Sequence, residues 1–303
     1  MSRNGGRGLA RTHVDFPEDW EILEAEGAGG FTTRVTYRRP DGSEHVWTSR
    51  RHRKGRGPRN RDAQGAKSLR RSPWLQLWAP GRISWWVAAS FVLGSALFAL
   101  GASSSLWFQS FLGGELASRI ADWSYFLGAT VFTGAIYLQI LETVNADPHP
   151  VRARRRSDET FRWFAWQPRR LSYMEAFVLF VGSIFFNVET ALALLGVSGK
   201  EGVNWLLSVP SFLGALLFVT GCYMQVVEAC HRYLCLRPRS VSWWSATFNF
   251  LGCVGFLAGA VFGFQAPGLS TPADPTLVKA AYLQGSIFFL IGSYLMIPEM
   301  FSE

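Results

Sequence analysis

The sequence predicts an all-α polytopic membrane bundle of six transmembrane helices, arranged as three parallel two-helix repeats behind a small N-terminal cytoplasmic β module. Three observations support this prediction. Apolar residues gather into long uncharged runs after about residue 83. Arginines concentrate in alternate loops between those runs, and a motif that ends on glutamate occurs three times. We expect domain boundaries at residues 1–49, 50–82 and 83–303.

Residues 1–49 form the predicted β module. The stretches FTTRVTYRR (31–39) and EHVWTS (44–49) flank a Pro-Asp-Gly-Ser turn, which is the pattern of two antiparallel strands. A third short strand at residues 20–25 could join them. So small a sheet is marginally stable alone, so we expect it to pack on the membrane domain or on a cytoplasmic protein partner.

Residues 50–82 resemble a flexible basic arm. Ten basic residues lie between Arg50 and Arg71, against one acid, Asp62. Near an anionic leaflet each basic residue gains roughly 1 kcal/mol, so we expect the arm to contact anionic lipid headgroups. RNA is the alternative partner, but the arm has no aromatic stacking platform, and no specific nucleic acid is expected.

Six apolar runs follow, and each has close to the ~20 residues that a helix needs to cross a ~30 Å hydrocarbon core. Trp and Tyr occur at many of their edges, as in the aromatic belt of the headgroup region. The runs are 85–103, 124–141, 173–195, 205–227, 243–264 and 280–298.

Arginine placement predicts the orientation, because Lys and Arg in short loops stay on the cytoplasmic side. Loops two and four are rich in arginine, whereas loops one, three and five carry one basic residue each: Arg119, Lys200 and Lys279. Both termini are therefore expected in the cytoplasm of a plasma-membrane protein. The first residues lack the apolar stretch of a cleavable signal peptide.

The repeat appears in the second helix of each predicted hairpin. Gly, Phe, Tyr and Glu recur in three stretches: GATVFTGAIYLQILE (128–142), GALLFVTGCYMQVVE (214–228) and GSIFFLIGSYLMIPE (285–299). A Pro-x-x-x-Ser pattern precedes the first helix of each hairpin. The three units span about 83–143, 171–230 and 241–300. An even number of helices in each unit makes the repeats parallel.

The seven-residue spacing within this motif places small residues and the final glutamate on one helix face. Small residues let membrane helices approach closely, so the glutamate should lie at the cytoplasmic end of a helix seam. A carboxylate there opposes the helix dipole and needs a partner. The candidate helix-end clamp pairs Glu142, Glu228 and Glu299 with Arg82, Arg170 and Arg239, beside Ser84, Ser172 and Ser242 as N-caps. Proton or ion handling is the alternative role.

The third helix departs from the pattern, because its stripe reads Glu175, Gly182, Glu189. Glu189 should lie in the outer part of the bilayer on the packing face. Asn187, Ser208 and Ser211 are its expected partners in a candidate intramembrane polar site. A protonated glutamic acid bonded between helices and a residue of a transport path are both open interpretations.

The stretch VGSIFFNVET (181–190), with Trp205, Phe218 and Gly221 after it and GSIFFLIGS at 285–293, resembles the YrhK-like family of small bacterial membrane proteins. The resemblance covers about residues 80–303 and implies paired helices in a bacterial membrane. It implies no activity and no catalytic residue. The stretches that begin Gly128-Ala and Gly214-Ala lack the serine of the family pattern.

No catalytic pattern stands out elsewhere. Cys222 and Cys253 lie within predicted helices as packing residues. Cys230, His231 and Cys235 lack the spacing of a zinc site, and there is no phosphate loop or nucleophile elbow. We therefore expect no enzyme, metal or cofactor. The functions that remain are a non-catalytic scaffold or sensor and a proton- or ion-linked channel or carrier, and an oligomer is compatible with either.

Overall fold

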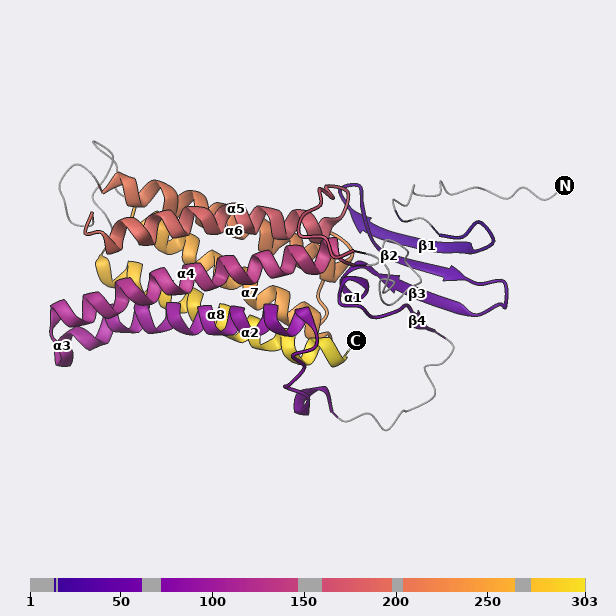
Figure 1. The fold of residues 1–303 in the computed structure, drawn as a ribbon, viewed down its shortest axis with the longest axis horizontal. Helices are drawn as coiled ribbons and strands as arrows, with labels where there is room; N and C mark the ends of the chain where they lie inside the picture. Colours follow the sequence, from indigo (N-terminus) through magenta and orange to yellow (C-terminus); the bar gives the residue numbers. More distant parts are fainter. Residues whose placement is uncertain are drawn as a thin grey trace.

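The computed structural model describes residues 14, 16–61, 72–146, 160–197, 204–264 and 274–302. It consists of a bundle of long helices with a small sheet at one end (Figure 1). The last helix ends at Ser302 on the same side of the bundle as the sheet. The predicted combination of a helical bundle and a small N-terminal antiparallel sheet is confirmed.

The sheet has four antiparallel strands in the order β1-β2-β3-β4. Gly29 and Gly30 join the first two strands with positive φ angles of 58° and 85°, which glycine adopts readily in a tight hairpin. One face buries Val35, Tyr37 and Trp47. The strands are β1 (Glu21–Ala28), β2 (Phe31–Arg38), β3 (Glu44–Thr48) and β4 (Arg59–Asn60).

The basic arm does not begin as flexible chain, which corrects the prediction for residues 50–60. A short helix, α1 (Ser49–Arg53), follows β3 directly, and β4 then returns to the sheet. The side chains of Arg50 and Arg53 are buried rather than directed to lipid. The reason is tertiary: α1 lies against the end of the bundle, where acidic groups compensate its charge. Residues 62–71 of the expected arm lie outside the described residues.

The described part of the chain contains six helices long and apolar enough to cross a membrane, as predicted. Three short segments accompany them: η2 (Pro73–Leu75), η3 (Ser104–Phe108) and α3 (Gln109–Leu112). The long helices are α2 (Ile83–Ser103), α4 (Gly114–Val144), α5 (Leu171–Leu194), α6 (Trp205–Cys230), α7 (Val241–Phe262) and α8 (Pro275–Ser302).

The loop expected at residues 104–123 is mostly helical, and this prediction is wrong. α2 continues through η3 and α3, and Gly113, with φ of 82°, turns the chain into α4. Arg119 lies inside α4. The 31 residues of α4 extend about 46 Å at 1.5 Å per residue, well beyond a ~30 Å hydrocarbon core. α4 is therefore longer than a crossing requires, and its first turns, which carry Glu115 and Arg119, replace the expected loop.

The six helices form a closed ring in which α2 contacts α4 and α8, and each remaining helix contacts its neighbours in sequence. Within α2–α4, α5–α6 and α7–α8, glycines face each other across the seam. A Cβ at Gly182 would lie 3.2 Å from the carbonyl oxygen of Gly214, and one at Gly252 would lie 2.9 Å from that of Gly285. Side chains larger than glycine would force these backbones apart.

Phenylalanines fill the centre of the ring in two adjoining groups. One group comes from the first helix of each pair, and its rings of Phe98 and Phe256 lie 5.6 Å apart. The other comes from the second helices, with Phe132 and Phe289 at 5.5 Å. The pairs are mostly tilted or edge to face, the favoured arrangement of aromatic rings. The six residues are Phe98, Phe186 and Phe256, then Phe132, Phe218 and Phe289.

The glycine seam can be tested at Gly221 of α6. A Cβ there would lie 2.8 Å from Cδ2 of Leu179, so Gly221→Leu should lower the free energy of unfolding by about 1–3 kcal/mol through overpacking. Leu216 is exposed on the same helix, and Leu216→Phe is the matched control that should unfold like wild type. Steric-trap unfolding in detergent or bicelles measures both variants. Equal stabilities would contradict close packing at this seam.

Candidate functional site

Four glutamates meet at the end of the bundle that faces the sheet, and we call them the carboxylate ring. Glu142, Glu228 and Glu299 lie near the C-terminal ends of α4, α6 and α8, as the seven-residue spacing placed them. Glu175 joins them from the start of α5. All four side chains are buried, with exposed fractions of no more than 4%. Buried carboxylates need positive partners because desolvation is costly.

Arg50 and Lys54 approach this ring from α1 and its C-cap. Arg50 makes a two-point contact with Glu299, with Nε 2.5 Å from Oε1 and Nη2 3.1 Å from Oε2. Its Nη1 lies 3.7 Å from Oε2 of Glu228. Lys54 places Nζ 2.7 Å from Oε1 of Glu299. Glu299 is therefore shared by two cations that come from a segment 245 or more residues earlier in the chain.

Arg53 contacts the other three carboxylates. Its Nη1 donates to Oε1 of Glu175 at 2.6 Å, and its Nη2 lies 3.4 Å from Oε2 of Glu228. Its Nε lies 3.8 Å from Oε2 of Glu142. Arg50 and Arg53 are three residues apart and so share a face of α1. We call these three cations together with the carboxylate ring the ionic latch, because it joins the sheet to the bundle.

Neutral groups add further hydrogen bonds to the latch. The Ser242 hydroxyl donates to Glu299 at 2.6 Å, and Ser49 donates to Glu228 at 2.7 Å. Gln139 Nε2 donates to Glu175 at 3.1 Å, and Ser84 donates to Glu142. The ring thus receives donors from the bundle as well as from α1.

The predicted serine caps need correction. The N-cap residues of α2, α5 and α7 are Arg82, Arg170 and Ser240, so Ser84, Ser172 and Ser242 lie inside the first turn. Ser84 and Ser242 bind glutamates instead of capping their helices. In two of its three occurrences, the serine of the Pro-x-x-x-Ser pattern therefore donates a hydrogen bond to a buried glutamate.

The predicted arginine partners of the clamp are also wrong. The guanidinium of Arg82 lies 5.5 Å from the ring centre of Phe301, and Arg170 donates to the carbonyl of Thr143 at 3.2 Å. Arg239 lines a cavity between the sheet and α7. These arginines lie at helix starts on the outside of the ring, whereas the glutamates face its axis. The cations of α1 reach the axis from the sheet and pair with the glutamates in place of these arginines.

Competition between burial and attraction sets the protonation of the cations. Burial alone would lower the pKa of Arg50 and Arg53, but the neighbouring glutamates outweigh it and raise both. For Lys54, burial and repulsion from the two arginines outweigh the contact with Glu299, and the pKa falls. Lys54 is thus the least compensated cation of the latch, although its Nζ touches a carboxylate.

Glu189 lies at the other end of the bundle, beside a cavity of about 100 Å³. Asp122, Tyr125 and Tyr282 also line this cavity. Of its predicted partners, the structure brings Ser211 near Glu189, and the Ser211 hydroxyl lies 3.3 Å from that of Tyr282 on the cavity wall. The sequence did not indicate Asp122, because residues 104–123 were expected to form a loop.

The other two predicted partners of Glu189 turn elsewhere. Asn187 Nδ2 donates to Thr133 at 2.6 Å, and its Oδ1 accepts from Thr130 at 3.2 Å, so it joins α5 to α4. Ser208 donates to the carbonyl of Asn204 within its own helix at 3.2 Å. The phenylalanines at the centre of the ring lie between the Glu189 cavity and the ionic latch along the bundle.

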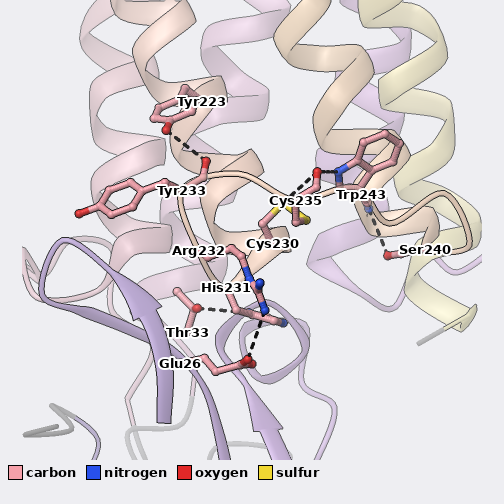
Figure 2. The surroundings of a disulfide bond; sticks show 10 residues. All are labelled: Glu26, Thr33, Tyr223, Cys230, His231, Arg232, Tyr233, Cys235, Ser240 and Trp243. Carbon is pink, nitrogen blue, oxygen red and sulfur yellow. Dashed lines mark hydrogen bonds and ion pairs between the residues drawn. A yellow bond between two sulfur atoms is a disulfide. The ribbon is translucent and has the colours of Figure 1, made fainter.

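Cys230 and Cys235 form a disulfide in the turn between α6 and α7 (Figure 2). His231 follows α6 in the left-handed conformation, with φ of 59°, and its Nδ1 lies 3.2 Å from Oγ1 of Thr33 in the sheet. Within the described residues, no group of three His, Cys, Asp or Glu side chains could hold a metal ion.

A comparison of this chain with protein-family models, curated proteins and solved structures finds no match. The function therefore has to be inferred from the geometry of the chain itself.

The ionic latch can be tested by removing one charge. Arg53→Gln leaves buried carboxylates without their central cation, and breaking a buried pair from one side typically costs 3–5 kcal/mol. We expect faster hydrogen exchange throughout residues 31–60, measured by mass spectrometry, while the helices stay protected.

Arg38→Gln is the matched control, because Arg38 pairs with Glu21 and Glu44 on the exposed part of the sheet, where a pair contributes about 0–1 kcal/mol. Its exchange should match that of wild type outside the immediate strand. Unchanged exchange in Arg53→Gln would show that the latch does not hold the sheet on the bundle.

Proposed function

We propose that this multi-pass membrane protein is a non-catalytic scaffold or sensor in which the sheet is a module docked onto the bundle by the ionic latch. The observation that carries this proposal is the insertion of Arg50, Arg53 and Lys54 among four buried glutamates. No pair of groups arranged for nucleophilic or acid–base chemistry on a substrate supports a catalytic role among the described residues.

The chemistry of the latch favours a docked state and a released state over gradual movement. A buried ion pair adds little net stability compared with apolar packing, because desolvation offsets the attraction. When α1 separates from the bundle, however, water can hydrate both its cations and the four glutamates, so the loss of the ion pairs is offset by hydration. The module therefore can change between two states at modest cost, which is the physical requirement of a sensor.

A cytoplasmic protein partner for the module is part of the proposal. β1 lies at the edge of the described sheet, and Leu23 and Glu24 on it are exposed. Edge strands offer backbone groups to which another chain can add a strand. Release of the module from the bundle would change how this edge is presented.

Three parallel two-helix repeats remain our proposal for the origin of the bundle, with the YrhK-like resemblance as its sequence counterpart. The equivalent glycine contacts and the two phenylalanine groups support it. We further propose a bacterial plasma membrane, with the sheet and both termini in the cytoplasm, from the arginine distribution.

The Cys230–Cys235 disulfide speaks against that orientation, because it lies at the sheet end and disulfides persist in oxidising compartments. Cysteine labelling in intact cells decides the matter. Ser110→Cys, at the far end of the bundle, should react with a membrane-impermeant maleimide, whereas Asp41→Cys, in the β2–β3 turn, should react only after permeabilisation. The opposite pattern would reverse the orientation.

A proton- or ion-linked carrier is the second candidate. It is favoured by the cavity that Glu189 and Asp122 both line. Intramembrane carboxylates commonly mark ion paths. Glu189→Gln keeps the shape of the side chain and removes its titration.

We expect no pH-dependent proton flux from wild-type protein in liposomes, and no change in Glu189→Gln, because phenylalanines fill the axis between this cavity and the latch. A pH-sensitive dye inside the liposomes measures the flux, with empty liposomes as the baseline. Flux in wild type that disappears in a folded Glu189→Gln variant would favour the carrier and overturn the scaffold.

A further inference from the structure

A second, larger cavity lies between the sheet and the α6–α7 turn. Its volume is about 880 Å³, within the range of sites that hold small molecules and cofactors. The sheet contributes Arg34 and Arg59, and the bundle contributes the start of α7. We call it the basic cavity.

Positive charge dominates the lining of the basic cavity. Glu228 and Glu299 are its two carboxylates, and both are already engaged by the ionic latch. Arg50 and Lys54 belong to the latch as well, and Arg34 pairs with Glu26 at 2.9 Å. The excess charge on which the site depends is that of three further lining arginines, Arg59, Arg237 and Arg239.

Two of the three cations of the latch line the basic cavity and have donor capacity left. Arg50 Nη1 and Lys54 Nζ are buried without a geometrically good hydrogen bond, although each is near a carboxylate, at 3.7 Å and 2.7 Å. The side chain of Lys54 is only 6% exposed, and that of Arg50 is 8% exposed. Buried donors of this kind gain most from an additional acceptor.

The loop that carries Arg237 and Arg239 is held in place before any ligand arrives (Figure 2). The Cys230–Cys235 disulfide closes the turn, Trp243 donates to the carbonyl of Cys235 at 3.1 Å, and Tyr223 donates to that of Tyr233 at 3.1 Å. A preorganised site loses less conformational entropy on binding. Ser240 caps α7 here, and the positive end of that helix dipole adds to the field.

We propose that the basic cavity binds a small anion that carries two or more phosphate charges, presented by a lipid headgroup or by a soluble phosphate compound. Arginine guanidinium groups suit phosphate because they donate several hydrogen bonds in a fixed plane. Basic pockets beside membrane helices are known sites for doubly charged phospholipid headgroups. This site goes beyond the proposed function and does not depend on release of the module.

His231 on the cavity wall reports the same positive environment. Its pKa is lowered to about 4, first by burial and then by the nearby Arg237 and Arg34, which outweigh the opposing effect of Glu26. An added proton is disfavoured in this cavity, whereas an added anion would be stabilised by the arginines that line it.

The test uses the full chain in nanodiscs of phosphatidylcholine, titrated calorimetrically with inorganic pyrophosphate. Saturable binding that weakens as salt rises is expected. Arg59 and Arg239 lie on opposite walls of the basic cavity and outside the ionic latch. Arg59→Gln and Arg239→Gln should each weaken pyrophosphate binding by about tenfold or more, because each removes one charge-assisted hydrogen bond.

Arg232→Gln is the matched control. Arg232 lies in the same loop as Arg239, is exposed, and sits 3.8 Å from Glu26 instead of lining the cavity. Its affinity for pyrophosphate should equal that of wild type. Circular dichroism and gel filtration verify the fold of all three variants.

A second arm identifies the source of the phosphate. Fluorescent cardiolipin is titrated into the same nanodiscs, and pyrophosphate is added as competitor. Saturable cardiolipin binding that both cavity variants weaken assigns the site to a lipid headgroup, whereas binding of pyrophosphate alone assigns it to a soluble compound. No saturable binding in either arm, or equal loss in all three variants, would overturn the site without bearing on the scaffold proposal.

Discussion

Burial of four carboxylates at one end of the bundle is the constraint on which the architecture depends. Burial disfavours all four glutamates, and the helix dipole also disfavours the three near helix C-termini. Among the described residues, the bundle supplies hydroxyl and amide donors to them and no cation within ion-pair distance. The missing positive charge comes from α1. The sheet therefore has a structural reason to lie where it does, because its strands hold α1 against the ring of helices.

The two halves of the bundle are held by different physics. In the membrane, glycine contacts set the distance between paired helices, and phenylalanines fill the space that the closed ring leaves on its axis. At the sheet end, charge and hydrogen bonding replace aromatic packing. The apolar half is tightly packed, whereas the ionic half can be hydrated. Any change of state is therefore confined to the sheet end, where the basic cavity also lies.

Local sequence was sufficient for the six helices, for strands β1 to β3 and for the alignment of Glu142, Glu228 and Glu299 on the inner face of the bundle, but not for β4. Hydropathy and helical periodicity are properties of neighbouring residues, so they can be derived without tertiary information. The partners could not be derived in this way. In the helical hairpins, the arginines closest in sequence to these glutamates are Arg82, Arg170 and Arg239. The cations that contact the glutamates come instead from residues 50–54, which the sheet holds against the bundle.

A signal for those cations was present in the sequence. The alternation of β3 ends at Thr48, and Arg50 and Arg53 follow at a spacing that would place both on one face of a helix. The π-helical segment and long α4 could not be derived, because the mixed polar and apolar residues 109–123, with Gly113 and Gly114 among them, match a loop as well as a helix. Asp122 was missed for that reason.

The order of synthesis gives the ionic latch a further consequence. Arg50, Arg53 and Lys54 emerge from the ribosome before any of the six helices, whereas Glu299 belongs to the last helix, α8. The two-point contact of Arg50 can form only when α8 has been inserted beside α2 and α7. A bundle without α8 thus leaves Arg50 and Lys54 without Glu299, and this distinguishes it chemically from a finished one during membrane insertion.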